Sequence, residues 1–261
     1  MIATYDWFGY TLPIEERYQL IKEAGFDGVL MWWSDGFGRG DYRSGPELAR
    51  KAGLVIENIH CPIQQEHDLW KDSIDGESVL ESYLQCIADC AQFHIPTMVV
   101  HLPGDDCPCT PLGLDRVRKI AEKAEDTGIQ IALENLQNIQ NLSRILYAID
   151  SPQVGFCYDC CHHANYCPET DLLSLFGSRL MAVHLHDNGG SRRQHQLPFD
   201  GHINWRKTME NIAETGYTGM TALEPMNWDY QNLFIKEFLR QAAQKAQVLQ
   251  TLRRNSDCDN L

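Results

Sequence analysis

Short apolar runs alternate along the chain with longer segments in which apolar residues recur at helical spacing. The apolar runs predict strands over residues 2–9, 26–33, 54–60, 97–101, 129–134, 154–158, 180–185 and 220–224. The intervening segments predict helices over residues 13–24, 45–52, 76–94, 114–126, 140–149, 169–176, 205–215 and 232–252. The pattern is therefore strand then helix, repeated eight times.

Repeated strand–helix units imply parallel strands joined by right-handed crossovers. Eight such units within 261 residues favour a closed (β/α)8 TIM barrel over an open doubly wound sheet. We expect a single domain over residues 1–252, followed by a polar, frayed tail over residues 253–261. No Gly-x-Gly-x-x-Gly or Walker-type loop is present, which disfavours a nucleotide-binding fold.

The charge balance narrows the class of ligand. The formal net charge is −14, and no basic stripe is visible in the sequence. Nucleic-acid binding draws its affinity largely from neutralised phosphates, so we expect no nucleic-acid partner. No apolar run is long enough for a membrane span. The composition favours a protein that acts on small molecules.

The cysteines and the N-terminus bear on the compartment. The chain has ten cysteines, and its first residues do not combine a basic segment with a long apolar stretch. Thiols stay reduced in the cytoplasm, so we expect a cytoplasmic protein without structural disulfides.

Polar residues that can bind metals stand at the ends of six predicted strands. They are His60, His101, Glu134, Asp159 with His162 beyond it, His184 with His186 and Asp187 beyond it, and Glu224. The C-terminal ends of the strands of a TIM barrel meet on one face, where the active site lies. Converging carboxylates repel one another unless a cation compensates. Carboxylate oxygen and imidazole nitrogen suit Mn²⁺, Mg²⁺, Co²⁺ or Zn²⁺, so a divalent metal is the expected cofactor.

Aromatic and basic residues near the strand ends are candidates for substrate contacts. Trp7 and Trp33 lie near the ends of the first two predicted strands, and their rings could form a wall against the apolar face of a sugar. Arg192 and Arg193 follow the seventh strand, where a loop could reach over the substrate. A guanidinium suits a phosphate or a hydroxyl-rich ligand, and a solvated surface pair is the alternative.

Four segments, taken in order, resemble the signature of the xylose isomerase-like TIM-barrel superfamily. They are Ile131-Ala132-Leu133-Glu134-Asn135, Asp159-Cys160-Cys161-His162, Val183-His184-Leu185-His186-Asp187 and Ala222-Leu223-Glu224-Pro225. The superfamily includes sugar and sugar-phosphate isomerases and epimerases, inosose dehydratases and endonuclease IV. The resemblance covers most of the chain.

The resemblance implies a metal site made of Glu134, Asp159, His184 and Glu224, as in the ketose 3-epimerases. His184 is preferred to His186 because the family pattern is His-apolar-x-Asp. In such epimerases the two glutamates are also the acid/base pair. The implied activity is a metal-dependent isomerase or epimerase of a sugar, sugar phosphate or related polyol, which moves a proton through an enediolate.

The resemblance also implies alternatives. His60, His101, His162 and His195 fall where endonuclease IV has further ligands, so they are candidates for a second metal or for the substrate. Arg193 stands where that enzyme would have an aspartate, and a guanidinium repels a metal. This disfavours the three-metal nuclease that cleaves abasic DNA.

Three further possibilities stay open. A dehydratase on the same scaffold would share the proton-abstraction step and then lose water. A metabolite sensor would bind without turnover. The sequence is compatible with a homo-oligomer. It does not identify the substrate or the metal, because one fold serves several reactions.

Overall fold

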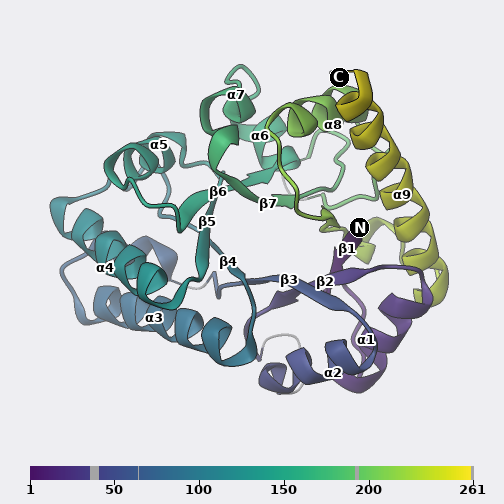
Figure 1. The fold of residues 1–261 in the computed structure, drawn as a ribbon, viewed down its shortest axis with the longest axis horizontal. Helices are drawn as coiled ribbons and strands as arrows, with labels where there is room; N and C mark the ends of the chain where they lie inside the picture. Colours follow the sequence, from purple (N-terminus) through teal and green to yellow (C-terminus); the bar gives the residue numbers. More distant parts are fainter. Residues whose placement is uncertain (36–40, 64, 192–193, 260–261) are drawn as a thin grey trace.

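The computed structural model describes residues 1–35, 41–63, 65–191 and 194–259, with the side chains of residues 256–259 left out. Eight parallel strands form the centre of the molecule, and helices surround them (Figure 1). The strands are β1 (Ile2–Tyr5), β2 (Gly28–Trp32), β3 (Val55–His60), β4 (Thr97–Val100), β5 (Gln130–Glu134), β6 (Val154–Asp159), β7 (Leu180–His184) and β8 (Thr221–Leu223).

The α-helices of the described residues are α1 (Ile14–Glu23), α2 (Gly45–Lys51), α3 (Ile74–Phe93), α4 (Pro111–Thr127), α5 (Ile139–Ala148), α6 (Cys160–Tyr166), α7 (Leu172–Phe176), α8 (Trp205–Glu214) and α9 (Ile235–Asp259). One α-helix follows each strand, as the apolar pattern predicts, except that two, α6 and α7, follow β6. Short 3-10 helices are η2 (Tyr42–Ser44), η3 (Glu66–Trp70), η4 (Gly177–Arg179) and η5 (Asn227–Asp229). None of the described helices is both long and apolar enough to cross a membrane.

The sheet closes into a barrel. Its strand order is β7-β6-β5-β4-β3-β2-β1-β8, and an isolated parallel bridge joins Leu185 to Leu223 across the remaining gap. The amide of Leu185 donates to Ala222 O at 3.0 Å, and the amide of Glu224 donates to Leu185 O at 3.0 Å. The (β/α)8 TIM barrel predicted from the sequence is confirmed.

Local sequence signals account for the helix ends. Ser73 and Thr110 accept hydrogen bonds from the amides of Gly76 and Gly113 at the start of α3 and α4. Gly128 ends α4 with a φ of 72°, a left-handed conformation that glycine adopts without strain. These caps set the entry and exit points of the helices that cover the barrel.

Two apolar cores flank the barrel wall. The larger lies between the strands and the helices and includes the buried face of α3, with Val79, Leu80 and Ile87. The smaller lies inside the barrel and consists of Val99, Ala132, Cys157 and Ala182, with Met181 packed against it. The nine cysteines that precede residue 256 are all free thiols.

The C-terminal segment corrects one sequence-based expectation. Helix α9 continues through Asp259, so residues 253–259 extend this helix and are not a separate frayed tail. Arg253 is buried, its Nη1 donates to Gly219 O at 2.8 Å, and its guanidinium lies 4.9 Å from the ring centre of Tyr217. These contacts hold the last turns of the helix against the barrel.

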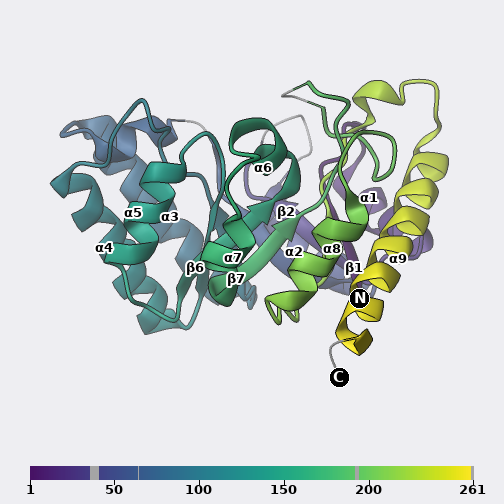
Figure 2. The same cartoon turned by 90° about the horizontal axis from the view of Figure 1, so that it is seen from above.

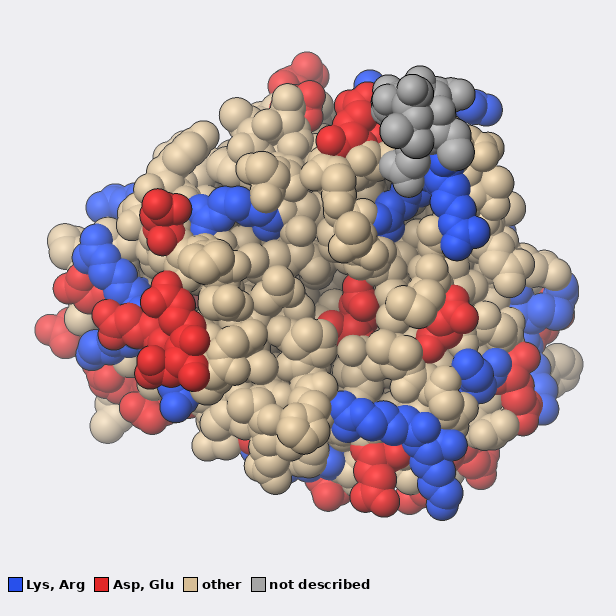
Figure 3. Space-filling view, viewed as in Figure 1, with Lys and Arg blue, Asp and Glu red and all other residues tan. Residues whose placement is uncertain are grey.

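The two ends of the barrel differ. In Figure 2, α6 and the loops that follow the strands lie along the upper edge, and both chain termini lie toward the lower edge. The upper edge is therefore the C-terminal end of the strands, because α6 follows β6 directly. On the face seen in Figure 3, acidic and basic side chains are interspersed around the rim and form no continuous basic surface among the described residues.

Candidate metal centre and active site

A cavity of about 500 Å³ opens at the C-terminal ends of the strands. Side chains from strand ends and from the loops after them line it: Tyr5, Trp7, Trp32, His60, Ile63, His101, Glu134, Leu136, His162, His195, Glu224, Met226 and Trp228. This is the end of a TIM barrel at which active sites are built. Every lining histidine and carboxylate was singled out from the sequence.

Four side chains form a buried cluster at the base of this cavity. Glu134 ends β5, Asp159 ends β6, His184 ends β7, and Glu224 directly follows β8. Each offers a ligand atom, and these atoms all lie within 4.8 Å of one another. The structure thus brings together the quartet that the sequence resemblance implies.

Strand alternation explains why these side chains meet. Side chains two residues apart on a strand point to the same side. Each residue of the small core inside the barrel precedes a site residue by two positions, in the pairs Val99–His101, Ala132–Glu134, Cys157–Asp159 and Ala182–His184. The polar residues therefore form the next layer of the barrel interior, above a floor of small apolar side chains.

His184 lies between the two glutamates. Its Nδ1 is 3.2 Å from Glu224 Oε2 and 3.4 Å from Glu134 Oε2. Its edge also faces the ring of Tyr5, at 6.0 Å between ring centres and an interplanar angle of 86°. Both glutamates therefore point toward one imidazole at the centre of the barrel.

Asp159 is held from several directions. Its Oδ1 accepts the amide of His162 at 2.7 Å, which caps α6, and its Oδ2 lies 2.9 Å from His186 Nε2. Asn135 clamps the backbone of Asp159, donating from Nδ2 to its carbonyl oxygen at 2.9 Å and accepting its amide at 2.8 Å. His186 and Asn135 therefore orient this carboxylate, which is the usual task of residues behind a metal ligand.

The site carries strongly perturbed charges. Burial would raise the pKa of Glu134, but the charges and hydrogen bonds of His184, His101 and His162 together outweigh burial and hold that pKa well below its ordinary value. The same balance lowers the pKa of Glu224 to about 2. Burial opposes a charged His184, yet the acidic groups around it raise its pKa well above the ordinary value. The buried carboxylates are thus held ionised by neighbouring positive charge.

The donor set fits a divalent cation. His184 Nδ1 and Glu224 Oε2 are buried, and neither makes a hydrogen bond of ordinary geometry with a described residue, although they lie 3.2 Å apart. Three carboxylates and one imidazole supply the oxygen and nitrogen donors that such ions prefer. An ion between them would satisfy both atoms and replace proton charge with metal charge.

Of the additional histidines, three lie beside Glu134 and one lies beside Glu224. His60 Nε2 and His101 Nε2 lie 3.3 Å and 3.0 Å from Glu134 Oε2, on the side of β3 and β4. His162 Nδ1 is 3.1 Å from Glu134 Oε1, at the wall of the cavity. His195 lies on the other side, where its Nδ1 is 3.0 Å from the carbonyl oxygen of Glu224.

His186 and His195 stack face to face, with ring centres 4.0 Å apart and an interplanar angle of 6°. Ligand atoms of His186, His195 and Glu224 lie within 4.8 Å of one another, but nitrogen lone pairs lie in the ring plane, so the two stacked rings direct theirs side by side and not toward one point. His186 already contacts Asp159, and we read His195 as a wall of the cavity. The sequence did not indicate the positioning contact of His186, because the family pattern favoured its neighbour His184.

The aromatic wall corrects one of the two tryptophan predictions. Trp7 lines the cavity, with the buried Arg17 guanidinium 5.7 Å from its ring centre. Trp33 does not line it, because its side chain is buried on the helix side and Nε1 donates to Asp89 Oδ2 at 2.8 Å. Trp32 takes its place and stacks on His60 at 5.2 Å and 27°. Adjacent residues at a strand end point to opposite sides, so only one of the two could face the site.

This correction yields a stability prediction. Trp33→Phe removes the donor to the buried Asp89 and should lower the free energy of unfolding by about 1–3 kcal/mol. Trp228→Phe, at a half-exposed position, should change it by less than about 0.5 kcal/mol. Urea denaturation followed by circular dichroism measures both. A Trp33→Phe variant that kept full stability and lost substrate affinity would restore Trp33 to the substrate wall.

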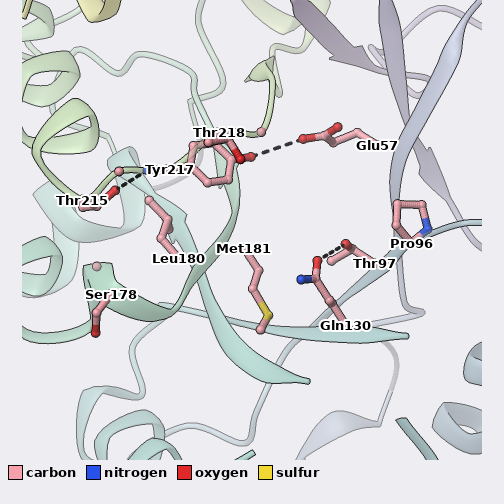
Figure 4. A pocket seen from close by; sticks show the side chains of 13 residues that line it. Glu57, Pro96, Thr97, Gln130, Ser178, Leu180, Met181, Thr215, Tyr217 and Thr218 are labelled. Atoms are coloured by element: carbon pink, nitrogen blue, oxygen red, sulfur yellow. Dashed lines mark hydrogen bonds between the residues drawn. The ribbon is translucent and has the colours of Figure 1, made fainter. Parts of the chain in front are cut away.

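A second pocket, at the opposite end of the barrel, serves as a contrast. It lies at the first residues of β4, β5 and β7, and Glu57 is its single carboxylate (Figure 4). Glu57 Oε1 accepts the amide of Met220 at 2.8 Å and the hydroxyl of Tyr217 at 3.3 Å. Polar groups there bond to one another, which indicates a structural role at this end.

Arg192 and Arg193, predicted to contact substrate, lie outside the described residues.

The family follows from a sequence model described as the xylose isomerase-like TIM barrel, which matches residues 18–252. This chain belongs to that family. An uncharacterized protein of Sinorhizobium fredii, y4fM, is 37% identical, with 80% of this chain and 79% of that protein covered. Fructoselysine 3-epimerase of Shigella flexneri is 26% identical, with 82% and 85% covered.

A further relative matches over a shorter stretch. The uncharacterized protein MJ1311 of Methanocaldococcus jannaschii is 33% identical over 120 residues, and the match covers 42% of this chain and 41% of that protein. The chain thus spans less than half the length of this relative and about four fifths of the two others.

Solved structures share the fold. A D-tagatose 3-epimerase-like protein superposes with a TM-score of 0.75 at 20% identity, covering 100% of this chain and 99% of that one. D-psicose 3-epimerase from Clostridium cellulolyticum H10, solved with D-tagatose, gives a TM-score of 0.75 at 18% identity, with 98% and 99% covered. At this level of identity the likeness establishes the barrel architecture.

Proposed function

We propose that this family member is a divalent-metal-dependent epimerase or isomerase of a sugar or related polyol. The observation that carries the proposal is the buried quartet of Glu134, Asp159, His184 and Glu224 at the base of an aromatic-walled cavity. The epimerase names of a relative and of several structural neighbours support the same class of reaction.

Within this proposal the quartet would hold the metal. When bound, a divalent ion polarises a carbonyl and stabilises negative charge that develops on neighbouring oxygens. Asp159, oriented by His186 and Asn135, would act as a fixed ligand and take no part in proton transfer. His184, buried between the glutamates, would be the single imidazole ligand.

Glu134 and Glu224 would carry the proton. Both line the cavity, and they reach its base from β5 and from the end of β8, where one oxygen of each lies near His184 Nδ1. One carboxylate would remove the proton beside the carbonyl, and the other would return a proton to the opposite face. Low pKa values keep both groups ionised in the metal-free site, which is the form in which a carboxylate can accept a proton.

His162 and the aromatic residues would position the substrate. His162 Nδ1 is 3.1 Å from Glu134 Oε1 and lines the cavity, so it can place a hydrogen bond on a substrate oxygen beside the reacting carbon. Trp7 and Trp32 would cover the apolar face of the sugar and exclude water, which strengthens the electrostatic contacts at the base.

Solvent deuterium exchange tests this function. Candidate ketoses are incubated in D₂O with the protein and Mn²⁺, Co²⁺ or Mg²⁺, and mass spectrometry measures deuterium incorporation. We expect incorporation at a carbon beside the carbonyl that requires both the protein and the metal. A full panel of ketoses without incorporation would contradict the proposal. Product analysis separates an epimerase from a dehydratase, which would lose water.

The nuclease alternative has less support. The described residues that line the cavity include no lysine or arginine that could contact a DNA phosphate. The nuclease predicts about three metals per chain and cleavage of abasic DNA, whereas the quartet predicts one metal. Elemental analysis together with an abasic-DNA cleavage assay decides between them.

A further inference from the structure

The walls of the cavity are mostly apolar, with His162 and His195 as the polar side chains among them. Apart from the histidines and carboxylates, the described lining consists of the side chains of Tyr5, Trp7, Trp32, Ile63, Leu136, Met226 and Trp228. A free sugar displays hydroxyl groups around its ring, and each buried hydroxyl needs a hydrogen-bond partner. These walls offer few partners, so the part of the ligand that lies against them has few hydroxyl groups.

The mouth of the cavity exposes two large apolar side chains. Ile63 is 40% exposed and Trp228 is 50% exposed, and they come from the loops after β3 and β8. The indole of Trp228 packs edge-on against His195, with ring centres 5.3 Å apart at 81°, and so stands at the rim of the site. Exposed apolar surface at a cavity mouth marks a place where ligand or partner surface is buried.

Among the described residues, which do not include Arg192 and Arg193, the charges around the cavity disfavour a phosphate. A phosphate is usually bound by arginine, lysine or free amides at a helix start, and the described lining has neither basic residue. At the start of α6, the amide of His162 is already bonded to Asp159. Next to the cavity, and sharing Ile63 and Leu136 with it, lies a groove lined by acidic residues: Glu66, Asp105 and Asp106. A dianion would be repelled there.

We propose, on the basis of the proposed function, that the physiological substrate is an unphosphorylated ketose or polyol that carries an apolar alkyl or aryl substituent. The ketose end would lie at the quartet, and the substituent would lie against Met226 and Trp228 and reach the rim. Burial of the exposed indole face would supply the binding energy that a phosphate supplies in sugar-phosphate enzymes.

The test compares three matched substrates with the metal-loaded protein: a free 2-ketohexose, its 6-O-benzyl ether and its 6-phosphate. We expect kcat/KM for deuterium exchange to be about 10- to 100-fold higher for the benzyl ether than for the free ketose. We expect the phosphate to fall below the free ketose. A preference for the phosphate, or equal values for the ether and the free ketose, overturns the inference while the proposed function stands.

Two variants locate the effect. Trp228→Ala should reduce the ratio of benzyl ether to free ketose to about one. Phe234→Ala removes a side chain that is 87% exposed and does not line the cavity, so it should preserve the ratio. Isothermal titration calorimetry gives a readout independent of turnover. If no sugar exchanges deuterium, the proposed function fails. Calorimetry then still tests the apolar subsite, which predicts that the benzyl ether binds more tightly than the free ketose and that Trp228→Ala removes this difference.

Discussion

Removing divalent metal with a chelator is expected to abolish deuterium exchange and to lower the thermal midpoint of unfolding by roughly 5–10 °C. The loss of exchange follows because the carbonyl is no longer polarised. The change in midpoint follows because an ion held at about 100 times its Kd stabilises the folded state by about 2.7 kcal/mol. Differential scanning calorimetry, with each metal restored in turn, measures the shift.

Matched variants assign this effect to the quartet. Asp159→Asn removes one ligand charge and should abolish the metal-dependent rise in the midpoint. Glu57→Gln replaces a carboxylate in the pocket at the other end of the barrel, where the amide oxygen can still accept both hydrogen bonds, so the rise should persist. Metal-dependent stabilisation in Asp159→Asn equal to that of the unaltered protein would place the ion elsewhere.

The fold could be predicted because the chain repeats one simple pattern. Each apolar run was long enough for a strand buried on both sides, and each intervening segment showed helical spacing. For β8, the prediction of residues 220–224 differs from Thr221–Leu223 only at the ends. Strand ends are uncertain in sequence because they depend on where a neighbouring strand stops offering hydrogen-bond partners.

Helix α6 was missed for a different physical reason. It begins directly after β6 without a loop. Three of its seven residues are histidine or tyrosine, and its apolar residues show no helical spacing. The helix is started by Asp159, whose carboxylate accepts the amide of His162 at 2.7 Å. A residue read as a metal candidate thus also acts as a helix cap, and this second role is visible only in three dimensions.

The positions of the candidate ligands could be anticipated, and their mutual contacts could not. Strand alternation places Glu134, Asp159 and His184 inside the barrel once the strand ends are known. Whether His184 or His186 faces the glutamates depends on where β7 ends, and β7 ends at His184. His186, two residues beyond the end of β7, then contacts Asp159. Alternation also explains the error at Trp33, because Trp32 faces the site and its neighbour Trp33 points to the helix side.

The two glutamates should be separable by single substitutions. If Glu134 and Glu224 act on opposite faces of the reacting carbon, each removes the proton of one epimer. Glu134→Gln and Glu224→Gln, measured at saturating metal, should each lower epimerisation by about 10²–10⁴-fold. Each variant should still exchange the proton of the one epimer that the remaining carboxylate serves, and the two variants should retain opposite epimers.

This pattern distinguishes proton transfer from metal binding. A glutamine keeps an oxygen ligand but cannot accept the proton, so a variant that loses only a base retains exchange in one epimer. Loss of exchange in both epimers at saturating metal, in both variants, would mean that these side chains serve only as ligands. Exchange and epimerisation are followed together by mass spectrometry and chiral chromatography. Glu57→Gln should match the unaltered protein in both, because its carboxylate lies at the opposite end of the barrel.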